Sequence, residues 1–207
     1  NGETLLSSSV LNVTGSDAIV DWVMIELRSA ANPSTIIANK RALIQRDGDI
    51  VSTDGVSLLT FITVPNGNYY VSVKHRNHLG IMSNSPIALS GCSTASIDFT
   101  TSALVYTMST ITNTPRKQIG PVYTMWSGDV NSNKNVKYNG LNNDKDIVLF
   151  AVGAGTPNNS IGPVYRIEDA NLDGKIRYNN TDNERNIILN NVGPANTNNI
   201  LNQHTPN

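Results

Sequence analysis

The chain has 207 residues, with 39% hydrophobic and 15% charged side chains and a formal net charge of -1. Because it has no basic stripe, nucleic acid is excluded as an expected partner. It also lacks an apolar run of about 18 residues, so we expect no membrane insertion. Cys92 is the single cysteine, which excludes an internal disulfide. Much of the polar character comes from Asn, Ser and Thr, a composition that suits a secreted, extracellular β-protein.

The first segment is rich in β-prone side chains between residues 5 and 13. We predict residues 1–14 as an N-terminal strand. Two interpretations stay open: the strand is the first of its own domain, or it is donated to a neighbouring copy. An open sheet edge accepts an extended peptide through main-chain hydrogen bonds. Head-to-tail donation does not close on itself, so it would build a filament.

Residues 15–112 contain short β-prone runs separated by turn signals, which predicts a β-sandwich domain. In the first run, Val23, Ile25 and Leu27 share one face, and Trp22 lies on the other. The expected strands cover residues 20–28, 42–46, 58–64, 69–75, 87–89 and 97–99.

One hairpin within this domain has a more specific pattern. Residues 61–73 read Phe-Ile-Thr-Val-Pro-Asn-Gly-Asn-Tyr-Tyr-Val-Ser-Val, a β-rich run, a Pro-x-Gly turn and an aromatic-x-Val-x-Val run. This hairpin resembles the signature of prealbumin-like and CnaB-like sandwich domains, and the resemblance covers about residues 21–100. It implies the fold and says little about function, because that fold serves stalks, spacers and enzyme accessories alike.

Residues 113–207 contain an internal duplication. Residues 129–153 recur as residues 169–193 at a constant offset of 40, and the tetrapeptide Gly-Pro-Val-Tyr also occurs twice. Matches in both polar and apolar positions indicate two copies of one structural unit. Val136 and Ile176 occupy the apolar place after each polar loop, where we expect the two residues to pair with each other.

The polar loop of the second copy has the spacing of a calcium site. Asp169, Asn171 and Asp173 occupy alternate positions one, three and five, so their side chains can turn inward together. Gly174 permits the sharp turn at position six, and Lys175 offers its carbonyl at position seven. Calcium takes about six to eight oxygen ligands, which this pattern supplies.

The polar loop of the first copy keeps only part of this pattern. Asp129 and Asn131 are present, but Asn133 stands at position five and Lys134 replaces the glycine. Asn135 supplies the carbonyl at position seven. With fewer charges, this site is expected to bind calcium more weakly. A metal-free pair of Asn-rich turns is the alternative interpretation, because Asn and Asp favour turns.

The acid that closes each site must follow the loop, because position twelve is not acidic in either copy. Asp144 and Glu184 occupy equivalent places, as do Asp146 and Asn186. Only the first pair is acidic in both copies, so we favour it for the bidentate ligand. We keep the second pair as further candidate ligands.

The duplicated half resembles the dockerin-like repeats of secreted Bacteroidetes surface proteins. The matching segments are Gly-Asp-Val-Asn at residues 128–131, Val-Lys-Tyr at residues 136–138 and Asn-Asp-Lys-Asp at residues 143–146. The resemblance covers about residues 120–193. It implies two paired calcium sites and export to the cell surface. The expected fold class is therefore mainly β, with a prealbumin/CnaB-like sandwich followed by a small dockerin-like domain of calcium loops and helices.

Three functions compete on this basis. We favour an extracellular, calcium-stabilised structural or adhesive module without catalytic activity, whose partners are copies of itself or another surface protein. The alternatives are an accessory module of a secreted enzyme, binding glycans or spacing domains, and a dockerin that docks a cohesin-like partner. We expect no enzyme, because no catalytic motif is present. His75 and His78 should point to opposite faces of a strand and share no metal.

Overall fold

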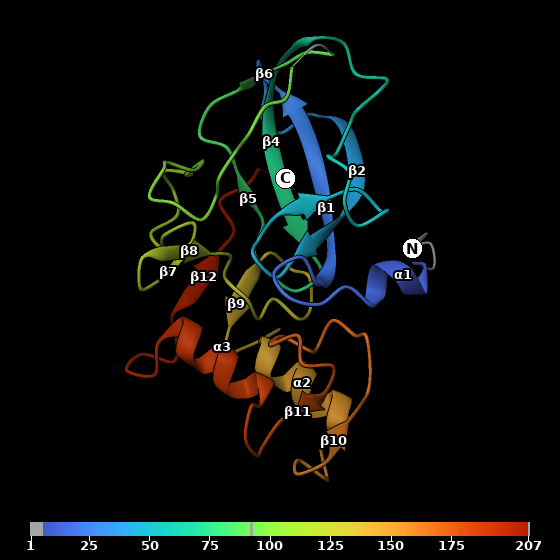
Figure 1. The fold of residues 1–207 in the computed structure, drawn as a ribbon. Coiled ribbons are helices and arrows are strands. Elements are labelled where there is room, and N and C mark those ends of the chain that lie inside the picture. The colour runs from blue at the N-terminus through green and yellow to red at the C-terminus, as the bar shows by residue number, and fades with distance from the viewer. Residues whose placement is uncertain (1–5, 92, 207) are drawn as a thin grey trace.

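The fold comes from a computed structural model that describes residues 6–91 and 93–206. Strands predominate over three short helices in this part of the chain, so the fold is mainly β. Figure 1 shows a curled antiparallel sheet above and a smaller unit with two helices below. We call residues 6–112 the sheet half and residues 113–206 the duplicated half. None of the helices in the described ranges is long and apolar enough to cross a bilayer.

The sheet half is built on one antiparallel sheet of order β3-β2-β1-β4-β5, with β6 also paired to β4. Val23, Ile25 and Leu27 of β1 are buried on one face together with Val71 and Val73 of β4, as the alternation predicts. The strands are β1 (Ile19–Ser29), β2 (Ile36–Gln45), β3 (Ile50–Val51), β4 (Gly67–His75), β5 (Ile81–Met82) and β6 (Ile87–Leu89).

Two predicted strands, residues 58–64 and 97–99, do not form. Leu58 makes only an isolated bridge to Val51. The side chains of Leu59, Phe61 and Phe99 instead pack against the buried face of the sheet. These side chains are buried although their backbone is irregular, so their burial does not require a strand paired with the sheet. In the hairpin of residues 61–73, only the second arm is therefore a strand.

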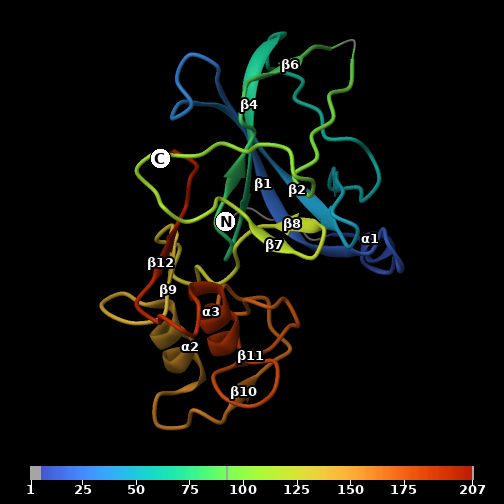
Figure 2. The same ribbon diagram turned by 90° about the vertical axis from the view of Figure 1, so that its left-hand side faces the viewer.

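The prediction of an N-terminal strand is wrong for residues 8–11, which form the short helix α1 (Ser8–Leu11). Residues 1–5 lie outside the described part, as does Cys92. The amides of Val10 and Leu11 donate to the carbonyl of Ser7, which satisfies the backbone locally. Val10 is buried in a cluster with Leu43 and Val51. Since this segment packs on its own chain (Figure 2), it does not support donation to a neighbour.

Replacing Val10 by Ala is expected to lower the free energy of unfolding by about 1–2 kcal/mol, because it empties space beside Leu43 and Val51. Leu11→Ala is the matched control, since Leu11 is 59% exposed, and should change stability by less than about 0.5 kcal/mol. Urea unfolding measures both. Equal effects of the two substitutions would contradict the packing of α1.

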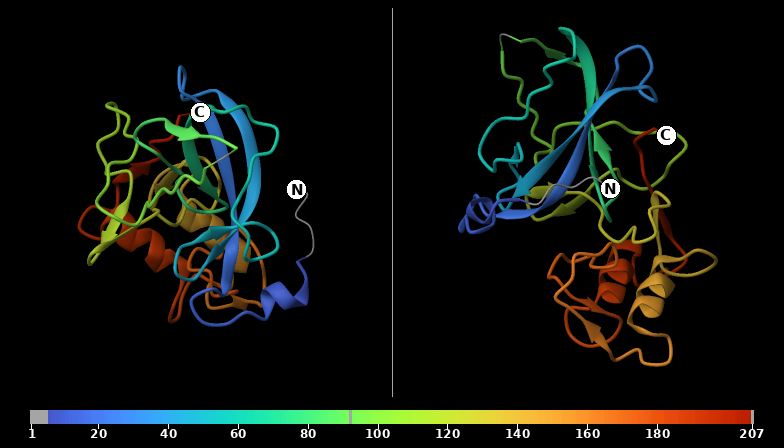
Figure 3. Two further views of the ribbon diagram at one scale, coloured as in Figure 1. Left: turned by 45° about the horizontal axis from the view of Figure 1, so that its top comes forward. Right: turned by 90° about the vertical axis from the view of Figure 1, so that its right-hand side faces the viewer.

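The two copies in the duplicated half are interlaced. The strand after each helix pairs with the loop strand of the other copy: β12 pairs with β9, and β10 with β11. Figure 3 shows these pairs beside the two helices. The elements are β7 (Lys117–Ile119), β8 (Val122–Thr124), β9 (Asn135–Lys137), α2 (Asp144–Val152), β10 (Ser160–Ile161), β11 (Ile176–Arg177), α3 (Glu184–Val192) and β12 (Ile200–Asn202).

This interlacing corrects the expected pairing of Val136 with Ile176. Val136 lies opposite Leu201, and Ile176 lies opposite Ile161. Val136 and Ile176 are nevertheless both fully buried in one shared core, which also contains Val148 of α2. Each copy therefore completes the sheet of the other, and the two copies form a single folding unit.

The two halves also interlock. Leu79, from the turn between β4 and β5, belongs to the core of the duplicated half. In the other direction, the chain after β12 returns to the sheet half. The main-chain carbonyl of Pro206 accepts a hydrogen bond from Arg28 of β1, and Thr205 contacts Lys74 of β4. Contacts from each half thus cross the predicted boundary between residues 112 and 113.

Candidate metal centre

The second loop, residues 169–175, folds around its first aspartate. Asp169 accepts hydrogen bonds from the amides of Asp173 at 3.1 Å and Gly174 at 3.0 Å. Asn171 accepts from the same Asp173 amide at 3.0 Å, and Asp173 accepts from the amide of Lys175 at 2.9 Å. Alternate side chains therefore turn back onto the loop.

The first loop, residues 129–135, repeats these contacts. Asp129 accepts from the amides of Asn133 and Lys134, both at 3.0 Å. Asn131 accepts from the Asn133 amide at 3.1 Å, and Asn133 from the Asn135 amide at 3.0 Å. The two loops therefore share one geometry despite their different residues at positions five and six.

The backbone of the two loops matches as well. Lys134 has φ of 68°, and its counterpart Gly174 has φ of 77°. A left-handed backbone costs a residue with a Cβ about 1–2 kcal/mol, whereas glycine adopts it freely. The first loop therefore reaches the same shape from a less suitable sequence.

The acids that we favour for closing the sites both lie against the loops. Asp144 accepts from the amide of Val130 at 2.9 Å and from that of Lys137 at 2.8 Å. Glu184 accepts from the amide of Arg177, the equivalent of Lys137. Both acids are fully buried, as the first residues of α2 and α3.

The second copy brings three carboxylates together. One oxygen from each of Asp169, Asp173 and Glu184 lies within 4.8 Å of the others. Of the two Glu184 oxygens, Oε2 accepts from the Arg177 amide, and Oε1 is buried without a hydrogen-bond partner. In the first copy, the side-chain oxygen of Asn135 is buried in the same way, although the sequence indicated only its carbonyl. Buried polar atoms normally have a partner, and for these two oxygens a water molecule or a cation can serve as one.

Asp146 and Asn186 do not join these groups. They lie in the first turn of α2 and α3, where Asn143 and Asn183 cap the helices. The amide of Asp146 donates to Asn143 at 2.9 Å, and that of Asn186 donates to Asn183 at 2.8 Å. The Asp146 carboxylate accepts from the Asn143 side chain. The main-chain amides of both residues thus take part in helix capping.

The buried acids carry raised pKa values. Burial raises the pKa of Asp144 to about 7, and the charge of Asp129 adds to this shift. Burial likewise raises the pKa of Glu184 to about 7. The pKa values of Asp129 and Asp169 are also raised by burial. A bound cation would offset the cost of these charges, and the donors, which are carboxylate, amide and carbonyl oxygens, fit a hard ion such as calcium.

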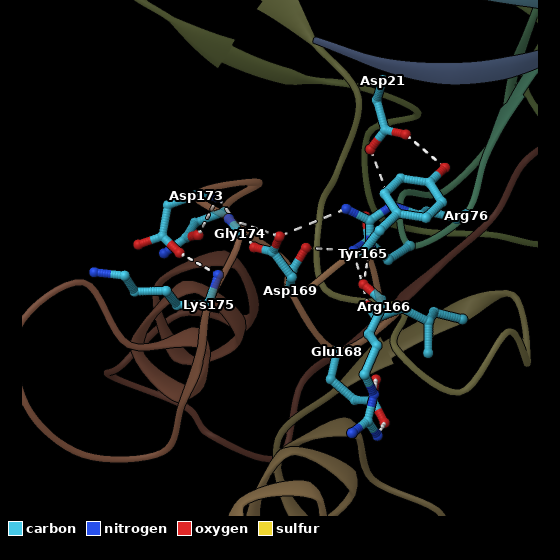
Figure 4. Close-up of polar contacts among 12 residues, drawn as sticks. Asp21, Arg76, Tyr165, Arg166, Glu168, Asp169, Asp173, Gly174 and Lys175 are labelled. Atoms are coloured by element: carbon cyan, nitrogen blue, oxygen red, sulfur yellow. Dashed lines mark hydrogen bonds and ion pairs between the residues drawn. The ribbon is translucent and has the colours of Figure 1, made fainter. Parts of the chain in front are cut away.

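Sequence reasoning did not identify the basic groups beside the second loop. Arg177 approaches Asp173 with a nitrogen–oxygen distance of 2.7 Å. Arg76 of the sheet half lies 3.7 Å from a carboxylate oxygen of Asp169. Figure 4 shows Arg76 between the loop and Asp21 of β1. Arg76 lies far from Asp169 in the sequence. Arg177 follows Asp173 by four residues, on strand β11, and no calcium-loop motif includes it.

Asp21 anchors this contact between the halves. Its carboxylate accepts from Arg76 at 2.9 Å and from the hydroxyl of Tyr165 at 2.8 Å. Burial opposes ionisation, but hydrogen bonding and charge from His75, together with the charge of Arg76, hold the pKa of Asp21 well below its usual range. Asp21 is therefore an ionised, buried partner for Arg76.

The prediction that His75 and His78 point apart is wrong. Their ring centroids are 4.4 Å apart in an edge-to-face arrangement. The reason is that β4 ends at His75, so the following turn brings His78 back beside it. They do not form a three-ligand site, because Asp169, Asp173 and Glu184 are the one such group among the described residues.

Replacing Arg177 by Gln is expected to tighten calcium binding at the second loop about two- to fivefold, because the ion no longer competes with a guanidinium for Asp173. Lys137→Gln is the matched control: Lys137 donates to the carbonyl of Leu141 and not to a carboxylate. Calorimetric titration measures both. Weaker binding in the Arg177 variant would show that the guanidinium supports the site.

Comparison of the chain with family models, curated proteins and solved structures found no match.

Proposed function

We propose that this chain is a calcium-stabilised structural module of a secreted surface protein, with a prealbumin/CnaB-like first half and dockerin-like repeats in the second. The observation that carries the proposal is the buried, unpartnered oxygen of Glu184 beside Asp169 and Asp173. The second site would be formed by Asp169, Asn171, Asp173, the carbonyl of Lys175, and Glu184. The first site would be formed by Asp129, Asn131, Asn133, Asn135 and Asp144.

A structural role follows from what the loops adjoin. Val136 and Ile176 come directly after the loops and are fully buried in the shared core. Asp144 and Glu184 begin the two helices that cover this core. An ion bound between a loop and its helix would hold both on the core, so its binding free energy would contribute to folding.

The surface favours contact with a protein over contact with a glycan. The exposed aromatic side chains among residues 6–91 and 93–206 are Phe150 and Tyr165, and neither lies on the sheet half. Large apolar side chains are exposed on the irregular segments of the sheet half instead. These side chains are Val56, Leu58, Ile62 and Leu104. They support a protein partner, either another copy of the chain or another surface protein.

A symmetric docking surface on the helices receives less support. Lys145 and Arg185 match between the copies, but each lies over a tyrosine of its own copy, at 5.1 Å and 5.0 Å from the ring centroids. Phe150 is 68% exposed on α2, whereas its counterpart on α3 is Asn190. A cohesin-like partner would therefore meet different residues on the two copies.

The experiment that tests this function is a calorimetric calcium titration of the EDTA-treated protein, with melting temperature and particle size measured on the same samples. We expect saturable binding at two sites and a higher melting temperature, because a ligand that binds only the folded state stabilises it. Growth in particle size would identify copies of the chain as the partner. If calcium changed neither heat nor melting, the loops would be metal-free Asn-rich turns and the proposal would fail.

A further inference from the structure

Asn77, in the turn between β4 and β5, contacts both loops at once. Its side-chain amide nitrogen donates to the main-chain carbonyls of Ile167 at 2.8 Å and Asp169 at 2.7 Å. Its own main-chain carbonyl accepts from the amides of Gly128 at 2.9 Å and Asp129 at 3.1 Å. Asn77 is fully buried. One residue of the sheet half thus holds position one of both loops.

The orientation of the Asn77 amide is determined by its neighbours. Carbonyl oxygens only accept, so the Nδ2 group must face Ile167 and Asp169. The Oδ1 atom then faces Nδ1 of His78 at 2.8 Å, which assigns the proton to that nitrogen. Burial lowers the pKa of His78 well below its usual range, so this imidazole is neutral. The amide is therefore locked in the orientation that serves the second loop.

No other side chain of similar size supplies these contacts. Aspartate at position 77 would bring a carboxylate against the carbonyls of Ile167 and Asp169, and leucine would leave both carbonyls buried without this donor. The neighbouring Leu79 is buried in the core of the duplicated half, and its amide donates to the carbonyl of Trp126 at 2.8 Å. The turn is thus held on the duplicated half by Leu79 as well as by Asn77.

Both first-position aspartates connect this residue to the proposed ions. The carboxylates of Asp129 and Asp169 organise their loops, and the main chains of the same two residues contact Asn77. We propose that Asn77 is a positioning residue shared by the two calcium loops, through which filling of one loop favours filling of the other. This inference rests on the proposed function and adds cooperativity to it.

The test is calcium titration of the full chain by calorimetry, in the wild type and in Asn77→Leu. Asp144→Asn and Glu184→Gln, each disabling one loop, supply the intrinsic affinity of the other loop. In the wild type we expect the calcium affinity of each loop to be at least about fivefold higher when the other loop is filled. In Asn77→Leu the two loops should still bind, with this ratio reduced to about one.

Two further variants separate positioning from stability. Asn77→Ala removes the donor to the second loop in a smaller side chain, and replaces Asn77→Leu if that variant does not fold. Leu43→Ala removes buried volume in a different core of the sheet half, so it should lower the melting temperature and leave the cooperativity intact. A purely structural role of Asn77 would instead weaken both sites and keep the ratio.

The outcomes distinguish this inference from the proposed function. Cooperative binding that is lost at position 77 and kept in Leu43→Ala supports it. Two occupied but independent loops in the wild type, or cooperativity that persists in both Asn77 variants, would overturn it and leave the calcium function standing. Absence of any calcium binding by the wild type would overturn both.

Discussion

Replacing Glu184 by Gln is expected to weaken calcium binding at the second loop about 100-fold or more, since the number of charged ligands sets the affinity of such loops. The substitution keeps the size of the side chain and its contact with the Arg177 amide. It removes one negative charge from the cluster formed by the carboxylates of Asp169, Asp173 and Glu184. The first loop, closed by Asp144, should lose at most the cooperative part of its affinity.

The calcium-free Glu184→Gln protein should be at least as stable as the calcium-free wild type at pH 8. The reason is that Glu184 is fully buried and its raised pKa records an unfavourable charge. Asp146→Asn is the matched control, because it changes the same charge on a helix first turn away from the cluster. Calorimetry and urea unfolding measure the two properties. Two calcium ions bound with unchanged affinities in Glu184→Gln would refute the assignment of the site.

The second large effect concerns pH. Without calcium, Asp144 and Glu184 should each lower the free energy of unfolding by about 1–3 kcal/mol as the pH rises from 5 to 8. The pKa of each is raised to about 7 in the folded chain, from ordinary values of about 4. Between these limits the unfolded chain has released the proton that the folded chain still holds. A rise in pH therefore favours unfolding.

Calcium should reverse this dependence, because it binds the deprotonated carboxylates and its affinity rises with pH. The measurement is urea unfolding at pH 5, 6, 7 and 8 with EDTA and with excess calcium. The double variant Asp144→Asn, Glu184→Gln should lose most of the slope in EDTA. Asp21 contributes only in stronger acid, because its pKa is lowered. His78 and His204 have lowered pKa values and add an opposite dependence below about pH 6.5, so the wild type is compared with the double variant. Equal pH dependence of the wild type and the double variant in EDTA would contradict the raised pKa values.

Some features of this protein follow from local sequence alone. The alternation of Asp and Asn predicts loops whose side chains turn inward, and both loops show it. The offset of 40 carries over from residues to hydrogen bonds, as Asp129 and Asp169 demonstrate. The buried face of β1 was likewise readable from alternation. The loop and strand patterns involve residues a few positions apart, and the offset of 40 is found by comparing two such segments.

The placement of the closing acids was also predictable, though the roles of their neighbours were not. Only Asp144 and Glu184 are acidic at equivalent places, and both lie against their loops. Asp146 and Asn186 have suitable oxygens, but they are the third residues of α2 and α3. Their amides donate to the capping Asn143 and Asn183. Ligand type is visible in a sequence, whereas helix register depends on where the cap forms.

The sequence by itself determined the duplication, the two loops and most strands of the sheet, because periodicity and turn chemistry are local. Only the tertiary structure decided the helical state of Ser8–Leu11, the irregular path of residues 58–64 and the crossed pairing of Val136 with Leu201. It also decided that Asn77 holds both loops. In each case the partner lies far along the chain, and β-propensity yields to packing when a side chain finds burial without a neighbouring strand.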